Sequence, residues 1–427
     1  MTLDVRPDSV LPVSHSIYLP AMLTLLFALQ VATAQHDALR YDITLVPSDT
    51  GTHLLGEVEI AWRLASSDPV AVRLDSSMRV VRVLIDGRPN TRLSRTMYGR
   101  SVNDLVVPHQ KRAGDSITTR IRYHGLARGG VKVGANRAGQ RIFFATARGD
   151  SAQLWVPVAE RVALDRGSAV FRIQAPVGHR AMAPGSLEKV DTLPYGHAVW
   201  HYRMEGPAPI ASLAVATGPY QVRPLTPGRC GDGCAVVEVW SYSGEGGGRG
   251  SGALGRSWEM LEFYAARAGR YPYGRLVHVE APVGAALGAP GILFHPEGSL
   301  VGGGPGDSVL ALETARQWFG LAISPGEEDP WLLDGLAKYL ASLWQESSGR
   351  RIGTVRVDSL PDDLRGARAL HRLRAIIGDS VFFAGLRRFT SDRMHQSATR
   401  TDFVRSMSAA AGRDVGRDLQ QALDRAR

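Results

Sequence analysis

The chain has 427 residues, of which 44% are hydrophobic and 21% charged, so it is long enough for two or three folded domains. Its formal net charge is +9, but the arginines are scattered and no run of five or six basic residues occurs. Nucleic-acid binding needs a basic patch or stripe, so this pattern argues against that class of function. The 47 glycines and 24 prolines predict many turns and a β-rich portion.

The first 34 residues have the pattern of an export signal. Leu19 to Ala34 is apolar and uncharged and ends in Ala-Thr-Ala, a typical cleavage pattern. We expect residues 1–34 to be a signal peptide cleaved after Ala34, and the mature protein to be periplasmic or extracellular. The alternatives are a misassigned start codon, since Arg6 is the clear positive charge of the n-region, or a leader retained as an anchor. Only a retained leader would bring the protein to a membrane.

Residues 35–223 are expected to form an N-terminal β domain. Short runs alternate apolar and polar residues between Gly, Asp, Pro and Asn, the pattern of antiparallel strands with one buried face. The runs begin at Tyr41, Glu57, Val80, Ile117, Ala169 and Ala198. So many in succession predict a sandwich or a saddle-shaped sheet.

Residues 224–254 are expected to be a Cys/Gly-rich linker. Cys230 and Cys234 are a disulfide candidate in an oxidising compartment, the alternative being two free loop thiols. The loop that they would close is short, so the expected gain in stability is small.

Residues 255–427 show helical spacing. A helix that ends near Gly269 is followed by a strand at Leu276–Glu280. The helices expected next are 308–321 with Asp307 or Ser308 as N-cap, 330 to about 345, 364–377, 380–389, 401–411 with Thr401 as cap, and last turns up to the C-terminus. The whole chain is therefore expected to be an α+β multidomain protein, β first and helical second.

Local motifs in a fixed order resemble the aminopeptidase N (gluzincin) family. Gln317-Trp-Phe-Gly320 is followed by Trp331-Leu-Leu-Asp-Gly-Leu-Ala-Lys-Tyr339. The family core reads H-E-x-x-H-Q-W-F-G, a short spacer, then W-L-N-E-G-F-A-x-Y. Weaker matches include Trp155-Val-Pro157, Thr217-Gly-Pro-Tyr220 and Tyr271-Pro-Tyr273. The resemblance covers about residue 41 to the end, and implies an N-terminal β saddle and a thermolysin-like helical domain.

The resemblance also implies where zinc would be held, and those positions are altered. On the family template the two His positions hold Leu312 and Arg316, the general-base position keeps Glu313, and the third-ligand position holds Asp334. A catalytic zinc needs three protein ligands and one open position. Leucine has no donor atom, and a guanidinium is permanently cationic with no lone pair for a metal. We therefore expect no zinc cofactor here; zinc belongs to the alternative reading, a metallopeptidase with a rebuilt site.

The substrate side is altered as well. The family segment G-x-M-E-N binds the peptide amine through its Glu; the matching stretch here runs from Ala285 to Ala289, with Gly288 at the Glu position. Asp363 stands where the family has its oxyanion-stabilising Tyr, and a carboxylate would repel an oxyanion. Ala285, Gly288 and Asp363 are thus the expected lining of the substrate cleft.

These losses predict a non-catalytic pseudopeptidase that binds a peptide or protein in the inter-domain cleft, or acts as a structural partner. Without zinc, Arg316 is expected to bridge Glu313 and Asp334 in a buried network, since one cation then stands beside two surviving acids. A replacement metal site is not expected. His295 and Glu297 fit a loop–strand junction, and His197 and His201 fit a strand that holds them roughly 13 Å apart. Partner identity and oligomeric state stay open.

Overall fold

The computed structural model describes residues 36–92, 94–98, 102–149, 151–160, 165–225, 235–242, 254–300, 306–326, 329–347 and 364–426. These residues belong to one compact unit, Gln35–Arg427. The predicted leader, Cys230, Cys234 and Asp363 lie outside the described residues. Within the described part, no helix is long and apolar enough to cross a membrane.

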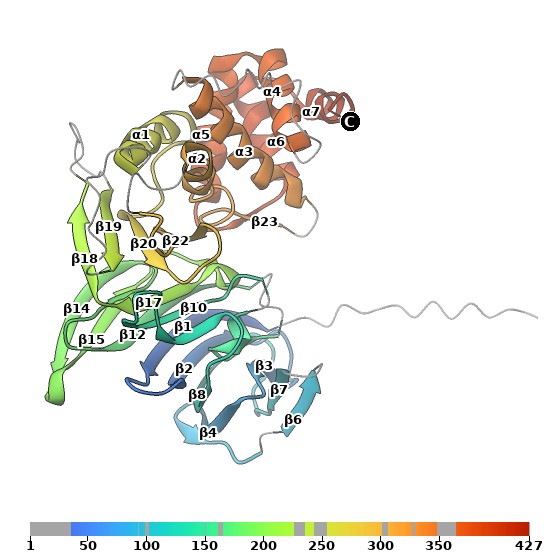
Figure 1. Ribbon diagram of the computed structural model, residues 1–427. Coiled ribbons are helices and arrows are strands. Elements are labelled where there is room, and N and C mark those ends of the chain that lie inside the picture. The colour runs from blue at the N-terminus through green and yellow to red at the C-terminus, as the bar shows by residue number, and fades with distance from the viewer. Residues whose placement is uncertain are drawn as a thin grey trace, which may run out of the picture. The chain divides into compact units, whose positions relative to one another are not determined.

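The largest sheet lies in the N-terminal half (Figure 1). Its strands, in spatial order, are β14 (Ser186–Leu193), β15 (His197–Arg203), β12 (Arg166–Pro176), β1 (Asp37–Pro47), β2 (His53–Arg63), β8 (Ser116–Leu126), β4 (Met78–Ile85) and β5 (Arg88–Pro89), with β16 (Ala208–Pro209) beside β12. Strand β2 shows why this half is β: every second residue is buried, as the alternating sequence predicts. The expectation of antiparallel strands is wrong at one place, because β1 and β12 pair in parallel.

Two four-stranded sheets complete this half. The first contains β13 (Arg180–Met182), β17 (Ala214–Gly218), β10 (Arg141–Thr146) and β9 (Val131–Ala135); the second contains β11 (Val158–Ala159), β3 (Val70–Asp75), β7 (Val102–Val107) and β6 (Ser94–Tyr98). Short 3₁₀ helices η1 (Ala152–Leu154), η2 (Pro194–Gly196) and η3 (Ile210–Ser212) connect strands.

A five-stranded sheet lies between the strand-rich half and the helices (Figure 1). It contains β18 (Tyr220–Pro224), β19 (Val236–Tyr242), β20 (Arg275–Ala281), β22 (Ile292–Pro296) and β21 (Leu287–Ala289). Alternate residues of its strands join different apolar cores: Val277 and Phe294 pack with the core of the strand-rich half, whereas Leu276 and Leu293 pack with the helical core. The sheet is therefore a middle layer that both cores share.

The first two helices lie between β19 and β20 along the chain, and the others follow the last strand of this sheet. They are η4 (Leu254–Arg256), α1 (Ser257–Ala268), α2 (Asp307–Ala315), α3 (Pro330–Ser347), α4 (Arg365–Ile377), α5 (Asp379–Arg393), α6 (Arg400–Ala411) and α7 (Gly416–Asp424), with the short strands β23 (Ser324–Pro325) and β24 (Ser397–Ala398) paired between them. The expected order of a sheet-rich part followed by a mainly helical part is confirmed.

Helix α5 ends at Arg393 rather than at the expected residue 389, and three further expected helix ends differ from the structure. Thr399, rather than Thr401, caps α6: its hydroxyl accepts from Asp402 N while the Asp402 carboxylate accepts from Thr399 N, a full capping box. Gly306, rather than Asp307 or Ser308, precedes α2, and Asp307 instead pairs with Arg256 at 3.1 Å. The last difference, the early end of α2, shapes the candidate site.

Candidate functional site

Helix α2 carries the predicted general-base position and packs deeply in the helical core. Leu310, Ala311 and Ala315 are fully buried, and the Tyr264 hydroxyl donates to Ala311 O at 2.9 Å. Burial of this face leaves the Glu313 side chain at the inner wall of a pocket, with only 9% of its surface exposed.

The α2 helix ends at Ala315, so the expected helix through Leu321 is wrong. Beyond it the chain turns back on itself: Gly320 has a φ of 127°, a conformation that L side chains rarely adopt, and its N–H donates to Ile323 O at 2.7 Å. This reversal brings Phe319 and Leu321 to the wall of the same pocket.

Gln317, two residues beyond the end of α2, is held by the neighbouring hairpin. Its buried side-chain oxygen accepts from Gly291 N at 2.8 Å, and its amide nitrogen donates to Ala289 O at 3.2 Å. Both partners belong to the β21–β22 hairpin. The motif glutamine thus fixes the end of α2 against that hairpin and aligns β21 with Glu313.

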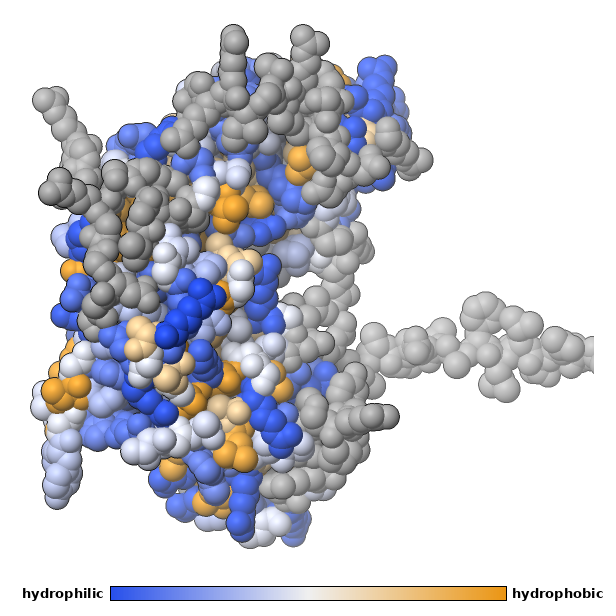
Figure 2. All heavy atoms as spheres, viewed as in Figure 1, coloured by the Kyte–Doolittle hydropathy of each residue, from blue (hydrophilic) through white to orange (hydrophobic). Residues whose placement is uncertain are grey.

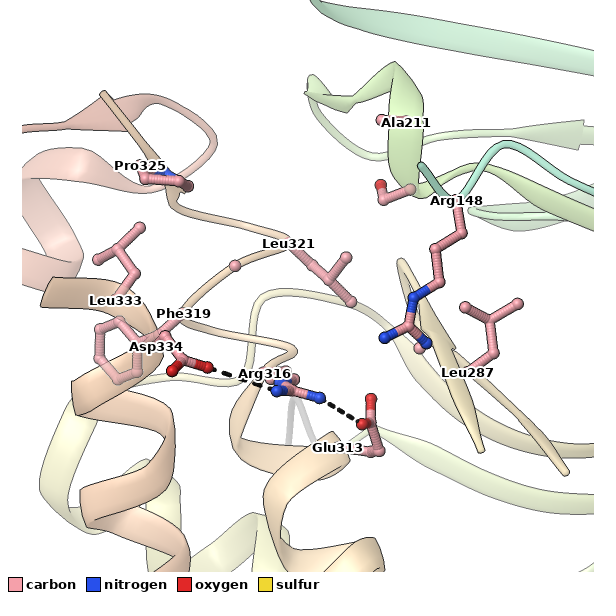
Figure 3. Close-up of a pocket in the computed structure, with 13 residues that line it drawn as sticks. Arg148, Ala211, Leu287, Glu313, Arg316, Phe319, Leu321, Pro325, Leu333 and Asp334 are labelled. Atoms are coloured by element: carbon pink, nitrogen blue, oxygen red, sulfur yellow. Dashed lines mark hydrogen bonds and ion pairs between the residues drawn. The ribbon is translucent and has the colours of Figure 1, made fainter. Parts of the chain in front are cut away.

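Arg316 contacts both acids that the sequence analysis placed beside it. Its Nη1 lies 2.6 Å from Glu313 Oε1 and its Nη2 lies 3.4 Å from Asp334 Oδ1 (Figure 3). The predicted bridge is confirmed as a set of contacts. The expectation that the whole network is buried is wrong, because 30% of the Arg316 side chain and 44% of the Asp334 side chain are exposed. Lys338, one helical turn after Asp334, adds a second cation at 2.9 Å from Asp334 Oδ2.

These residues face a pocket of about 250 Å³, which we call the Arg316 pocket. Its lining is Arg148, Ala211, Ser212, Leu287, Gly288, Glu313, Arg316, Phe319, Gly320, Leu321, Pro325, Leu333 and Asp334. The first three come from the strand-rich half and the rest from the middle sheet and the helical half. In Figure 3 the Arg148 side chain reaches into the pocket beside Leu287, toward Glu313.

The predicted cleft residues and the predicted ligand position Leu312 divide into three groups. Gly288 lines the pocket, and a Cβ added to it would lie 3.1 Å from Glu313 Oε2, so this position faces the predicted general base. Ala285 lies in an exposed loop and, among the described residues, is not part of the lining. Leu312 is partly buried against the helical core rather than in the lining. Asp363 lies outside the described residues.

The donor set at the pocket does not fit a catalytic zinc ion. Leu312 offers no donor atom, Arg316 is a cation, and the two carboxylates already face Arg316 and Lys338. Among the residues that the structure describes, no three His, Cys, Asp or Glu side chains gather closely enough to hold one metal ion.

The histidines weighed as other metal ligands have separate surroundings. His295 Nε2 lies 3.0 Å from His278 Nδ1, while Glu297 accepts from Arg137 N at 2.7 Å. His197 and His201 lie on strand β15, as expected, and their Nε2 atoms lie within 2.8 Å of different aspartates.

Local sequence patterns do not mark four residues of the lining: Arg148, Ala211, Ser212 and Pro325. They come from separate segments of the chain that only the fold brings together. Lys338 is different, because it follows Asp334 by four residues on a helix, a spacing that itself predicts an ion pair.

Comparison with known proteins rests on solved structures. No protein-family model matches the chain, and no curated protein matches it. The M1 zinc metallopeptidase of Deinococcus radiodurans matches with a TM-score of 0.72 at 21% identity, over 92% of this chain and 93% of that chain. Its glutamate-to-alanine variant bound to a Tyr-Ser-Ala substrate matches with a TM-score of 0.74 at 21% identity, over 92% and 94%. A two-domain M1 zinc metallopeptidase variant bound to L-tryptophan gives the same values. The chain therefore has the fold of the M1 zinc metallopeptidases, the aminopeptidase N-like enzymes that its sequence motifs resemble.

Proposed function

We propose that this protein is an exported, non-catalytic relative of the M1 zinc metallopeptidases that binds a peptide or protein segment in the Arg316 pocket. One observation carries the proposal: the Arg316 guanidinium stands between Glu313 and Asp334, at 2.6 and 3.4 Å. On the family template these acids are the general base and the third zinc ligand. A fixed positive charge beside both of them would repel a dication.

Binding is the function that the remaining features favour. The pocket draws its walls from both halves of the molecule, as ligand sites commonly do. Matching structures of the same fold hold a tripeptide substrate or a free amino acid. On the face seen in Figure 2, described apolar residues form small separate groups within a mainly hydrophilic surface, so the pocket is a better binding candidate than that face.

Export is part of the proposal because Leu19 to Ala34 is apolar and ends in a cleavage pattern. Intact-mass measurement of the protein purified from its native host tests this part. A mature chain that begins at Gln35 supports cleavage, and a mass that includes residues 1–34 contradicts it.

The zinc content of the mature protein tests the non-catalytic part. The protein is freed of loosely bound ions, its metal is measured by mass spectrometry, and hydrolysis of a panel of aminoacyl-p-nitroanilides is followed. We expect below about 0.1 zinc per chain, since at most one ligand, Asp334, remains of a three-ligand site. We also expect no hydrolysis above that of Glu313→Gln. About one zinc per chain, with hydrolysis that Glu313→Gln abolishes, would establish a metallopeptidase with a rebuilt site and overturn the proposal.

A further inference from the structure

The charges of the Arg316 pocket are not evenly paired. Among the described residues, four charged side chains line it, namely Arg148, Glu313, Arg316 and Asp334. Arg316 contacts both acids, and Asp334 has Lys338 as a second cation at 2.9 Å. The Arg148 guanidinium makes no hydrogen bond or ion pair with any residue that the structure describes. Among the described lining residues, Arg148 is thus a cation without an acid partner.

The backbone directs Arg148 toward the pocket. The residue follows strand β10, and its own N–H donates to Thr146 Oγ1 at 3.2 Å, which ties the turn to the strand end. From there the side chain reaches past Leu287 toward Glu313 (Figure 3). Its planar guanidinium carries five N–H donors in a fork that matches a carboxylate.

The rest of the lining is mostly apolar, and in Figure 3 Leu287 stands beside this cation whereas Phe319 and Leu333 stand beside Asp334. Leu287, Phe319 and Leu333 are almost fully buried, and Ala211 and Leu321 add further apolar surface. Arg148 itself is exposed, so an ion pair there becomes stronger than in open water only where the bound ligand and these walls exclude solvent. A ligand that combines a carboxylate with an apolar side chain would satisfy both features.

An amine is the competing ligand, and it fits less well. The oxygen it would use, Glu313 Oε2, faces Gly288, but the same carboxylate is already paired with Arg316 at 2.6 Å through Oε1. An incoming ammonium would also meet Arg148 and Arg316. Gly288 supplies no acid to offset these two like charges.

We propose that the Arg316 pocket binds the C-terminal residue of a peptide, with its carboxylate on Arg148 and its apolar side chain against Leu287 and Leu321. This inference rests on the proposed binding function and names its ligand class. The volume of about 250 Å³ agrees with the end of a chain, being just below the range of sites for drug-sized ligands.

Three small probes distinguish binding of a carboxylate from binding of an amine. N-acetyl-L-phenylalanine carries a carboxylate and no amine, L-phenylalaninamide an amine and no carboxylate, and N-acetyl-L-phenylalaninamide carries neither. Calorimetric titration of the mature protein at low salt should give the tightest binding for the first probe. Its advantage over the neutral probe should be on the order of tenfold, the usual strength of a charge-assisted hydrogen bond.

Arg148 variants assign the effect to this residue. Arg148→Gln should abolish the advantage of the carboxylate probe, and Arg148→Lys should keep part of it, because lysine retains the charge but not the fork. Arg82→Gln is the matched control, since Arg82 is exposed on β4, away from the pocket lining, and should leave all three affinities unchanged. Circular dichroism and melting curves check that each variant is folded.

Each other result overturns the inference. Equal binding of the acid and the neutral probe removes the role of the carboxylate but leaves a binding pocket in place. Tightest binding of the amine probe reverses the ligand class, and a carboxylate preference that survives in Arg148→Gln removes Arg148 from the site. If none of the three probes binds, the proposed ligand class is refuted. The non-catalytic proposal is tested separately, by zinc content and hydrolysis.

Discussion

Arg316 has a structural task whatever the pocket binds. The Glu313 side chain is only 9% exposed, and its 2.6 Å contact with Arg316 supplies the opposite charge that a buried carboxylate requires. Removing one partner of a buried pair costs more than the pair contributes, because the remaining charge is left unpaired. Because 30% of the Arg316 side chain is exposed, we expect the cost of breaking this pair to be smaller than for a fully buried pair.

Replacing Arg316 with methionine should therefore lower the free energy of unfolding. We expect a loss of about 1–3 kcal/mol for Arg316→Met, from the cost of an unsatisfied, mostly buried acid. The double variant Glu313→Gln/Arg316→Met should recover part of it, because the amide carries no charge. Urea unfolding at pH 7 measures all three proteins.

The matched control breaks an exposed pair of the same kind. Arg388 lies 3.6 Å from Asp392, and both side chains are more than half exposed. Arg388→Met should change stability by less than about 0.5 kcal/mol, as for other surface pairs. Equal losses of unfolding free energy in Arg316→Met and Arg388→Met would show that the pocket pair contributes no more to stability than an exposed pair.

At the scale of single residues, the sequence predicts contacts between residues at helical spacing but few other contacts of the site. Glu313 and Arg316 are three residues apart, so their contact follows from helix geometry, and the motif order placed Asp334 beside them. Arg148 belongs to a turn after β10, far earlier in the chain. Nothing in its neighbourhood indicates a pocket, because only tertiary packing brings that turn to α2.

At the scale of elements, the end of α2 is set by a partner outside the helix. The apolar spacing of residues 308–321 predicts one continuous helix, but the chain leaves it after Ala315. The buried Gln317 side chain hydrogen-bonds to Gly291 N and Ala289 O in the β21–β22 hairpin. Helix propensity and periodicity carry no information about such a partner, so the sequence could predict the helix but not its end.

Gln317 should therefore be more important for stability than an ordinary glutamine. Gln317→Met keeps the size but leaves the buried Gly291 N–H without its acceptor, so the free energy of unfolding should fall by about 1–3 kcal/mol. Because the same bonds align β21, binding of pocket ligands should weaken as well. Chemical unfolding and titration of the carboxylate probe give the two readouts.

An exposed glutamine supplies the comparison. Gln221 lies on β18 with its side chain in solvent, and Gln221→Met should leave stability within about 0.5 kcal/mol. If Gln317→Met is equally harmless, the hairpin is held by other contacts, and the explanation for the early end of α2 is wrong.

At the scale of the whole molecule, the two halves share a layer. The switch from alternating to helical patterns predicts a strand-rich half and a helical half, and both exist. It does not predict that Val277 and Leu276, neighbours on β20, belong to different cores. A strand that is buried on both faces lacks the alternation of apolar and polar residues. Its position between two cores therefore cannot be predicted from the sequence.

The helical face of this shared sheet contains a buried histidine pair. His278 and His295 join through a 3.0 Å contact, and His278 Nε2 lies 2.9 Å from Ser257 Oγ at the start of α1. Burial lowers the pKa of His295 to about 3. Burial, followed by the neighbouring His295, holds the pKa of His278 well below its usual range. Both rings are therefore neutral in the folded protein at neutral pH.

The sign of the resulting pH dependence follows from proton uptake. Below about pH 6.5, the ordinary histidine pKa, the unfolded chain binds protons that the folded chain does not bind. The contribution of the pair is thus complete above that pH and is lost progressively as the pH falls toward 3. Asp165 acts in the opposite direction, because burial raises its pKa to about 7 and its contribution is lost as the pH rises through that value. The contribution of the histidines to the pH dependence of stability is therefore isolated only by comparing a histidine variant with the unchanged protein.

Replacing one histidine should flatten the acid side of the stability curve. Between pH 6 and 4.5, each buried neutral histidine contributes a slope of up to about 1.4 kcal/mol per pH unit. His295→Gln should lower the slope of the unfolding free energy by about 1 kcal/mol per pH unit, whatever its effect on stability at pH 7. Urea unfolding at several pH values measures the slope, and His53→Gln, at an exposed position, should leave it unchanged. An unchanged slope in His295→Gln would mean that the pair takes up protons in the folded state, and the shared layer would then tolerate charge at its centre.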